Sequence, residues 1–136
     1  FMLKSGCINP PIMEVLAHLG HGDKILIADG NYPLAQKTGN AAKVYLGLVA
    51  GSPTVTEVLS ALQQEINIEA AAVMQPADGT EPEIFNEFRE MLPGVELSKL
   101  GRYEFYDAAS ENGVCLAIST GETRVFANLL ITVGVA

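Results

Sequence analysis

Two side chains that could move protons bracket a short apolar stretch near the start of the chain. His21 lies between two glycines, and Asp29 follows the apolar run 24–28. Histidine changes its charge near neutral pH, so it suits proton transfer. A carboxylate at the carboxyl end of a strand lies where open α/β sheets bind ligands. The segment therefore predicts a small acid–base site carried on a strand.

Each of these residues also has a purely structural interpretation. His21 could meet the carbonyl groups at the end of the preceding helix. Asp29 could form an Asx turn ahead of Gly30, and Asp23 could cap a turn at the other end of the strand. The local sequence leaves both interpretations open.

A second set of polar and aromatic residues lies in the last third of the chain. Arg102 can pair with a carboxylate or bind sugar hydroxyls. Tyr106 can pack on the apolar face of a sugar, or it can belong to the core with Phe105. Glu122 and Asn128 adjoin apolar strands, so both need polar partners. Backbone amides, a neighbouring subunit or a substrate could supply those partners.

Strands and helices must alternate to position these residues. Asn9 caps a first helix, and capping boxes at Thr54-x-x-Glu57 and Thr80-x-x-Glu83 open two more, with a short helix at Phe105–Ala109. The predicted strands are Lys24–Ala28, Val44–Val49, Ile68–Met74, Val114–Ser119 and Leu129–Val133, with a further extended segment at Val95–Leu100. This alternation predicts one α/β domain over residues 1–136, a layered sandwich with a largely parallel sheet flanked by helices.

The composition excludes several function classes. The net charge is −8 and no basic patch is visible, so we expect neither nucleic-acid nor membrane binding. Neither a Gly-x-Gly-x-x-Gly segment nor a phosphate loop occurs, and Cys7 and Cys115 lie far apart. We therefore expect no cofactor and no metal site, and free thiols in a cytoplasmic protein.

The chain is apolar for its length. Hydrophobic residues make up 49% of its 136 residues, and its mean hydropathy is +0.25. A small domain has limited room to bury such residues. A subunit interface is the usual place for the excess, so we expect a homo-oligomer. A monomer with an apolar surface is the alternative.

Several of these segments together resemble the fucose mutarotase and ribose pyranase family. The resemblance rests on Gly-His-Gly-Asp at 20–23, on Asp29 with the following Tyr32-Pro33, on Arg-Tyr-Glu-Phe-Tyr at 102–106, and on the closing Thr-Gly-Glu…Ala-Asn-Leu-Leu-Ile stretch. It extends from Pro10 to Val135. The sequence is more similar to the fucose mutarotase branch, because Gly22 and the 102–106 cluster match that branch.

The resemblance implies an enzyme that interconverts the cyclic forms of a free monosaccharide, such as L-fucose or D-ribose. It implies ring-shaped homo-oligomers, commonly decamers, with active sites at subunit contacts. By the same resemblance His21 and Asp29 are the catalytic residues. The predicted sugar-binding residues are Arg102, Tyr106, Phe126 and Asn128.

The chain departs from the family pattern at two positions. Phe126 stands where a tyrosine is usual, so it offers no hydroxyl for proton transfer or hydrogen bonding. Asn31 stands where fucose mutarotases often have a histidine. In the resulting hypothesis His21 transfers the proton, and Asp29 orients His21 or binds a sugar hydroxyl. The rivals are a non-catalytic sugar-binding or transport-associated protein and a purely structural ring subunit.

Overall fold

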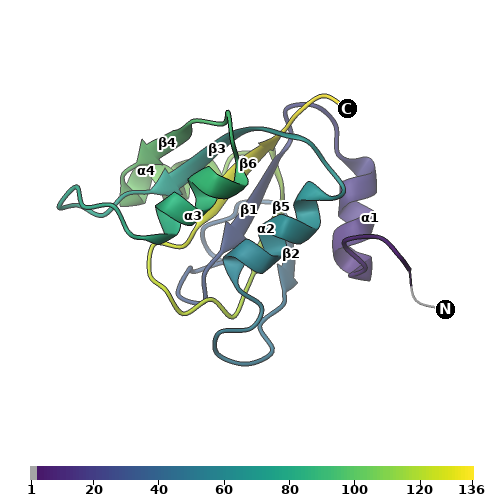
Figure 1. Cartoon of the computed structure of the whole chain (residues 1–136), viewed down its shortest axis with the longest axis horizontal. Helices are drawn as coiled ribbons and strands as arrows, with labels where there is room; N and C mark the ends of the chain where they lie inside the picture. The colour runs from purple at the N-terminus through teal and green to yellow at the C-terminus, as the bar shows by residue number, and fades with distance from the viewer. Residues whose placement is uncertain (1–2) are drawn as a thin grey trace.

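Six strands form one mixed sheet in the structure, a computed structural model that describes residues 3–136. The strands are β1 (Lys24–Ala28), β2 (Ala42–Tyr45), β3 (Ile68–Met74), β4 (Leu97–Leu100), β5 (Val114–Ser119) and β6 (Leu129–Val133). Their order is β2-β5-β1-β6-β3-β4 (Figure 1). β6 is antiparallel to β1 and β3, whereas the other pairs are parallel. The prediction of a largely parallel α/β sheet is confirmed, with one reversed strand at its centre.

Helices cover both faces of this sheet (Figure 1). They are α1 (Pro10–His18), α2 (Val55–Gln63), α3 (Ile84–Met91) and α4 (Arg102–Ala109). α1, α2 and α3 pack on the face that carries Ile25 and Ile27. α4 and the segment 32–41 pack on the face that carries Leu26 and Ala28. The alternation along β1 follows from the two-residue period of a strand, and the resulting core is continuous on each side.

Two of the three predicted helix caps are confirmed. The Ile12 N–H donates to the Asn9 side chain at 3.1 Å. Thr54 and Glu57 make the reciprocal bonds of a capping box. The capping box predicted at Thr80 is wrong: Thr80 bonds to Asp78 instead, and α3 starts without a side-chain cap. Thr80 bonds to Asp78 because a carboxylate two residues earlier in the chain is a nearby acceptor.

Two predicted elements have different bounds in the structure. The strand expected at Val44–Val49 is found at Ala42–Tyr45. Beyond it the chain turns back, with a bridge between Val49 and Ser52 and a positive φ of 87° at Gly51. The fourth helix begins at Arg102, three residues before the predicted start. Cys7 and Cys115 are free thiols, as expected. Among residues 3–136 no helix is both long and apolar enough to cross a membrane.

Candidate functional site

An open pocket of about 300 Å³ lies at the carboxyl edge of β1 and β3. Because β6 is antiparallel to both strands, the loop that leads into β6 reaches the same edge. The start of α4 contributes the remaining wall. Nine residues line the pocket: Asp29, Asn31, Tyr32, Met74, Arg102, Tyr106, Val125, Phe126 and Asn128. Five of the six predicted site residues are therefore brought together, and His21 is not among them.

Asp29 is the buried acid of this pocket, with 2% of its surface exposed. Its Oδ1 accepts the Asn31 N–H at 2.9 Å, and its Oδ2 accepts the Ala127 N–H at 3.2 Å. Burial raises the pKa of Asp29, these backbone bonds oppose that rise, and the nearby charge of Glu122 adds to it. The Asx-turn interpretation is thus confirmed, and the same carboxylate also lines the pocket.

Asn128 is fixed by the backbone of Asp29. The Asp29 N–H donates to Oδ1 of Asn128 at 2.9 Å, in a buried bond. That bond assigns the two ends of the amide, since a backbone donor needs the oxygen. Asn128 lines the pocket, so its Nδ2 group remains as a donor for a bound molecule.

Aromatic rings and a guanidinium form another part of the pocket lining. Arg102 Nε donates to the Tyr106 hydroxyl at 3.2 Å, and its guanidinium lies 5.7 Å from the centre of that ring. The hydrogen bond to Tyr106 raises the pKa of Arg102. Tyr106 also meets Tyr32 edge to face at 5.4 Å between ring centres. Tyr106 is half-buried and so serves both the core and the pocket, whereas Phe105 is wholly buried.

Phe126 has an unusual backbone conformation. Its φ is +58°, the one positive value at a non-glycine residue in the described part of the chain. The left-handed region is rare for bulky side chains, and such strain is often found at functional sites. The two residues that follow, Ala127 and Asn128, both bond to Asp29. The conformation of Phe126 therefore belongs to the local structure that shapes the pocket.

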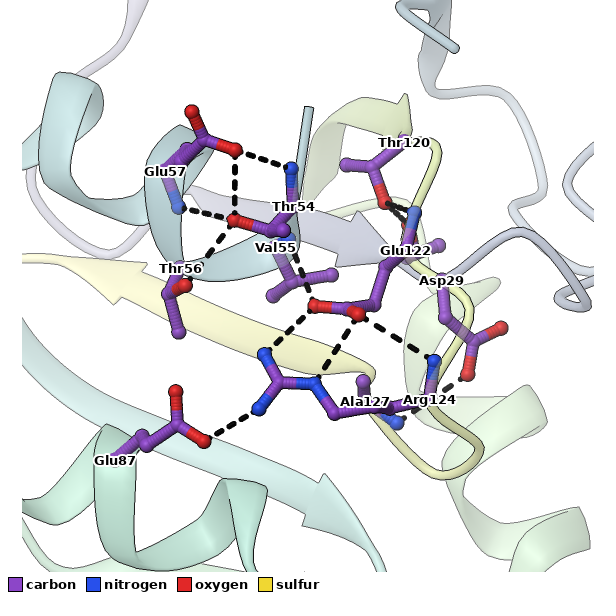
Figure 2. A network of polar contacts seen from close by, with 11 residues as sticks. Asp29, Thr54, Val55, Thr56, Glu57, Glu87, Thr120, Glu122, Arg124 and Ala127 are labelled. Carbon is purple, nitrogen blue, oxygen red and sulfur yellow. Dashed lines mark hydrogen bonds and ion pairs between the residues drawn. The ribbon is translucent and has the colours of Figure 1, made fainter. Parts of the chain in front are cut away.

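Glu122 finds its partners within the chain. It is 3% exposed, and it pairs with Arg124 and accepts the Val55 N–H at the start of α2 (Figure 2). Burial raises the pKa of Glu122, but the bonds and charge of Arg124 outweigh that effect and hold the pKa below its ordinary value. Of the partners considered from the sequence, backbone amides are found here, and the side chain of Arg124 is a partner that the sequence did not suggest.

His21 lies at the opposite edge of the sheet. Its side chain is 57% exposed, and Nε2 lies 2.8 Å from Oε1 of Glu69 at the start of β3. The five residues of β1, at ~3.3 Å each, place about 16 Å of strand between His21 and Asp29. Within one chain, Asp29 therefore does not orient His21. The carboxylate of Asp23 accepts the Gly20 N–H at 2.8 Å, which confirms its turn-capping role.

Comparison with known proteins decides the family. Residues 2–136 match the RbsD / FucU transport protein family. The chain belongs to this family. The D-ribose pyranase of Geobacillus kaustophilus is 32% identical to it, over 99% of this chain and 96% of the relative. The D-ribose pyranase of Corynebacterium glutamicum is 34% identical, over 99% of both chains.

Solved structures of both branches of the RbsD / FucU family superpose on the fold. The Bacillus subtilis RbsD complexed with D-ribose has a TM-score of 0.86 and 27% identity, over 99% of both chains. The Streptococcus pneumoniae fucose mutarotase in complex with L-fucose has a TM-score of 0.81 and 26% identity, over 95% of this chain and 94% of that one. These similarities do not specifically favour the fucose branch that the sequence motifs suggested.

For this family member, sequence reasoning missed four pocket residues: Asn31, which it noted only as a departure from the family pattern, Tyr32, Met74 and Val125. Met74 could have been found, because it ends a strand parallel to β1 and so reaches the same edge. Tyr32 follows Asp29 closely in the chain, whereas nothing in the sequence marks Val125. Among residues 3–136 no three His, Cys, Asp or Glu side chains gather in a way that could hold a metal ion.

Proposed function

We propose that this chain is an isomerase, a sugar mutarotase that interconverts the cyclic forms of a free monosaccharide such as D-ribose or L-fucose. The observation that carries the proposal is the convergence of Asp29, Arg102 and Asn128 on one pocket. A carboxylate, a guanidinium and an amide donor are groups that bind sugar hydroxyls. The sugar-bound relatives of the same fold support this substrate class.

The reaction opens a hemiacetal and closes it again. One group takes the proton of the anomeric hydroxyl while another donates a proton to the ring oxygen. Positioned acid–base groups accelerate such steps by ~10²–10⁴-fold. Asp29 accepts a sugar hydroxyl, while Arg102 and Asn128 donate to other oxygens, and the rings of Tyr106 and Phe126 pack on the apolar face of the sugar. No cofactor is required.

His21 is the proton-transfer residue in this proposal, and a second copy of the chain supplies it. His21 lies on an exposed turn at the edge of the sheet opposite the pocket, so another subunit can present it to Asp29. The arrangement requires a homo-oligomer, for which we propose a ring, as large as a decamer. The apolar side chains exposed at Tyr45, Leu48 and Val49 fit an assembled protein. The two free thiols fit a cytoplasmic location.

Saturation-transfer NMR on anomeric protons tests the proposal. Purified protein should accelerate exchange between the forms of ribose, fucose or galactose, and His21→Ala should abolish most of that acceleration. Absence of acceleration with every sugar would refute the enzymatic function.

A non-catalytic sugar-binding protein, associated with transport, is the second candidate. Phe126 favours it, since this side chain lacks the hydroxyl usual at its position. Sugar binding by calorimetry without any acceleration of exchange would select it. Failure to bind any monosaccharide would leave a structural ring subunit.

A further inference from the structure

The loop 120–128 forms one wall of the pocket without belonging to a helix or strand. Thr120 anchors its start through a 2.7 Å bond from Oγ1 to the Ala28 carbonyl. The Gly30 N–H donates to the Glu122 carbonyl at 2.9 Å, so the loop also touches the turn after Asp29. Beyond Glu122, side-chain contacts must determine the conformation that carries Phe126 to Asn128.

Glu122 and Arg124 supply the densest of those contacts (Figure 2). Oε1 of Glu122 accepts Nη2 of Arg124 at 3.0 Å and the Val55 N–H at 3.3 Å. Oε2 accepts Nε of Arg124 at 3.2 Å and the Arg124 backbone N–H at 3.4 Å. This is the two-pronged pairing that guanidinium and carboxylate groups favour. Arg124 also bonds to Glu87 of α3, so the loop is tied to two helices.

The ion pair makes this loop conformation hard to leave. Glu122 is 3% exposed and the side chain of Arg124 is 42% exposed, so loss of the arginine would leave a nearly buried carboxylate with only backbone N–H donors, which is unfavourable. A movement of the loop that carries Arg124 away would therefore leave Glu122 without its charged partner. Phe126 is only two residues further along and holds the strained φ of +58°. Strained conformations persist when surrounding contacts over-determine them.

We propose that Glu122 and Arg124 are positioning residues of the sugar site, whose ion pair holds the loop so that Ala127 and Asn128 meet Asp29. The inference rests on the proposed function and extends it to two residues that do not line the pocket. Arg124 acts by holding the conformation of the loop. Glu122 holds the loop as well, and because its charge lies near Asp29 it also affects the protonation of that acid.

The charge of Glu122 provides a readout that a merely structural role would not change. It contributes to the raised pKa of Asp29. The other titratable or charged groups at this pocket are Tyr32, Arg102 and Tyr106. Glu122→Gln keeps an oxygen for the Val55 N–H but removes the charge. Loss of that charge lowers the pKa of Asp29, so the acid limb of the kcat/KM profile, which reports an acid of the free enzyme, should lie at lower pH in Glu122→Gln than in a variant that disturbs the same loop and keeps the charge.

Arg124→Lys separates geometry from charge. It keeps the positive charge beside Glu122 but loses the planar fork. A displacement of about 1 Å at a site costs up to ~10²-fold in rate, so kcat/KM for sugar exchange should fall about 10- to 100-fold. The acid limb should lie at higher pH than in Glu122→Gln, because the charge of Glu122 is kept and a weaker Ala127 bond lowers the pKa of Asp29 less. Glu81→Gln is the matched control, because it removes an Arg89–Glu81 pair with two 3.0 Å bonds on the surface. It should leave rate and profile unchanged.

Backbone hydrogen exchange by NMR tests the loop without relying on activity. The Ala127 N–H should exchange at least about tenfold faster in Arg124→Lys than in the wild type, while Ile27 and Ile131 in the central strands keep their protection. Protection of Ala127 unchanged in Arg124→Lys, or an acid limb in Glu122→Gln no lower than in Arg124→Lys, would overturn the proposal. If the wild type accelerates no sugar exchange, the proposed function fails, and the Ala127 measurement still decides whether the ion pair positions the loop.

Discussion

The backbone N–H of Asp29 donates to Oδ1 of Asn128 at 2.9 Å, although 99 residues separate the two in the chain. The bond joins the end of β1 to the start of β6, at the centre of the sheet. It satisfies a buried backbone donor and leaves the Nδ2 group of Asn128 for the pocket. One side chain therefore serves stability and binding together.

Replacing Asn128 with alanine should destabilise the fold. The Asp29 N–H would lose its acceptor in a buried place, which costs about 1–3 kcal/mol. Urea unfolding measures the change in the free energy of unfolding. Asn31→Ala is the control, since Asn31 is exposed and its backbone N–H, which bonds to Asp29, is retained. Equal stability of the two variants would contradict the role assigned to the Asn128 amide.

The stability of the wild type should depend on the protonation of Asp29. Burial raises its pKa above the ordinary value of 3.8, so the folded chain keeps this proton to higher pH than the unfolded chain does. The free energy of unfolding therefore falls as pH rises from 3.8 through the raised pKa. Relative to Asp29→Asn, the wild type should lose about 1.4 kcal/mol for each unit by which the pKa is raised.

Asp78 gives a control of opposite sign for that titration. Hydrogen bonds from the Thr80 side chain and backbone lower the pKa of Asp78, so its ionised form stabilises the folded chain. The wild type should therefore gain stability relative to Asp78→Asn as pH rises through the lowered pKa and up to 3.8. Urea unfolding at a series of pH values checks both. Parallel curves for Asp29→Asn and the wild type would show that Asp29 titrates normally.

Local sequence rules predict several of the strands and helices that carry the site, but they do not predict how these elements come together. The apolar run before Asp29 predicts a strand end, and the caps at Asn9 and Thr54 are set by residues within one turn. The position of β6 depends on pairing with strands far away in the chain, which no local pattern specifies. The convergence of Asn128 on Asp29 was therefore invisible without the resemblance to a family. The separation of His21 from Asp29 could have been foreseen, because an extended strand keeps its two ends apart.

At position 126 the usual order of stability of alanine and glycine variants should be reversed. In most positions glycine destabilises the fold relative to alanine, because it is more flexible when unfolded. At a φ of +58° alanine keeps the left-handed strain, worth about 1–2 kcal/mol, and glycine relieves it. Phe126→Gly should therefore be at least as stable as Phe126→Ala in thermal or urea unfolding. At Ala108, inside α4, the ordinary order should hold, with Ala108→Gly less stable than the wild type.

Phe126→Tyr should raise the rate of sugar exchange. The ring lines the pocket, and a hydroxyl at its tip adds a donor and acceptor close to the bound sugar. We expect a several-fold higher kcat/KM in saturation-transfer NMR, since a hydrogen bond contributes ~0.5–1.5 kcal/mol. Tyr103→Phe, on the exposed surface outside the pocket, is the control for a hydroxyl change and should leave the rate as it is. A rate for Phe126→Tyr no higher than that of the wild type would show that the hydroxyl plays no part here.

Mixed oligomers should reveal whether two copies share a site. His21 and Asp29 lie at opposite ends of β1, so the proposed site takes each from a different subunit. His21→Ala and Asp29→Asn should each be inactive alone, yet co-assembled chains should recover part of the wild-type exchange rate, because some sites then combine two intact residues. A mixture of Asp29→Asn with Asn128→Ala should recover little of the exchange rate, because one chain contributes both residues to the same pocket. If the first mixture stays inactive although mass spectrometry shows mixed assemblies, His21 does not act across a subunit contact.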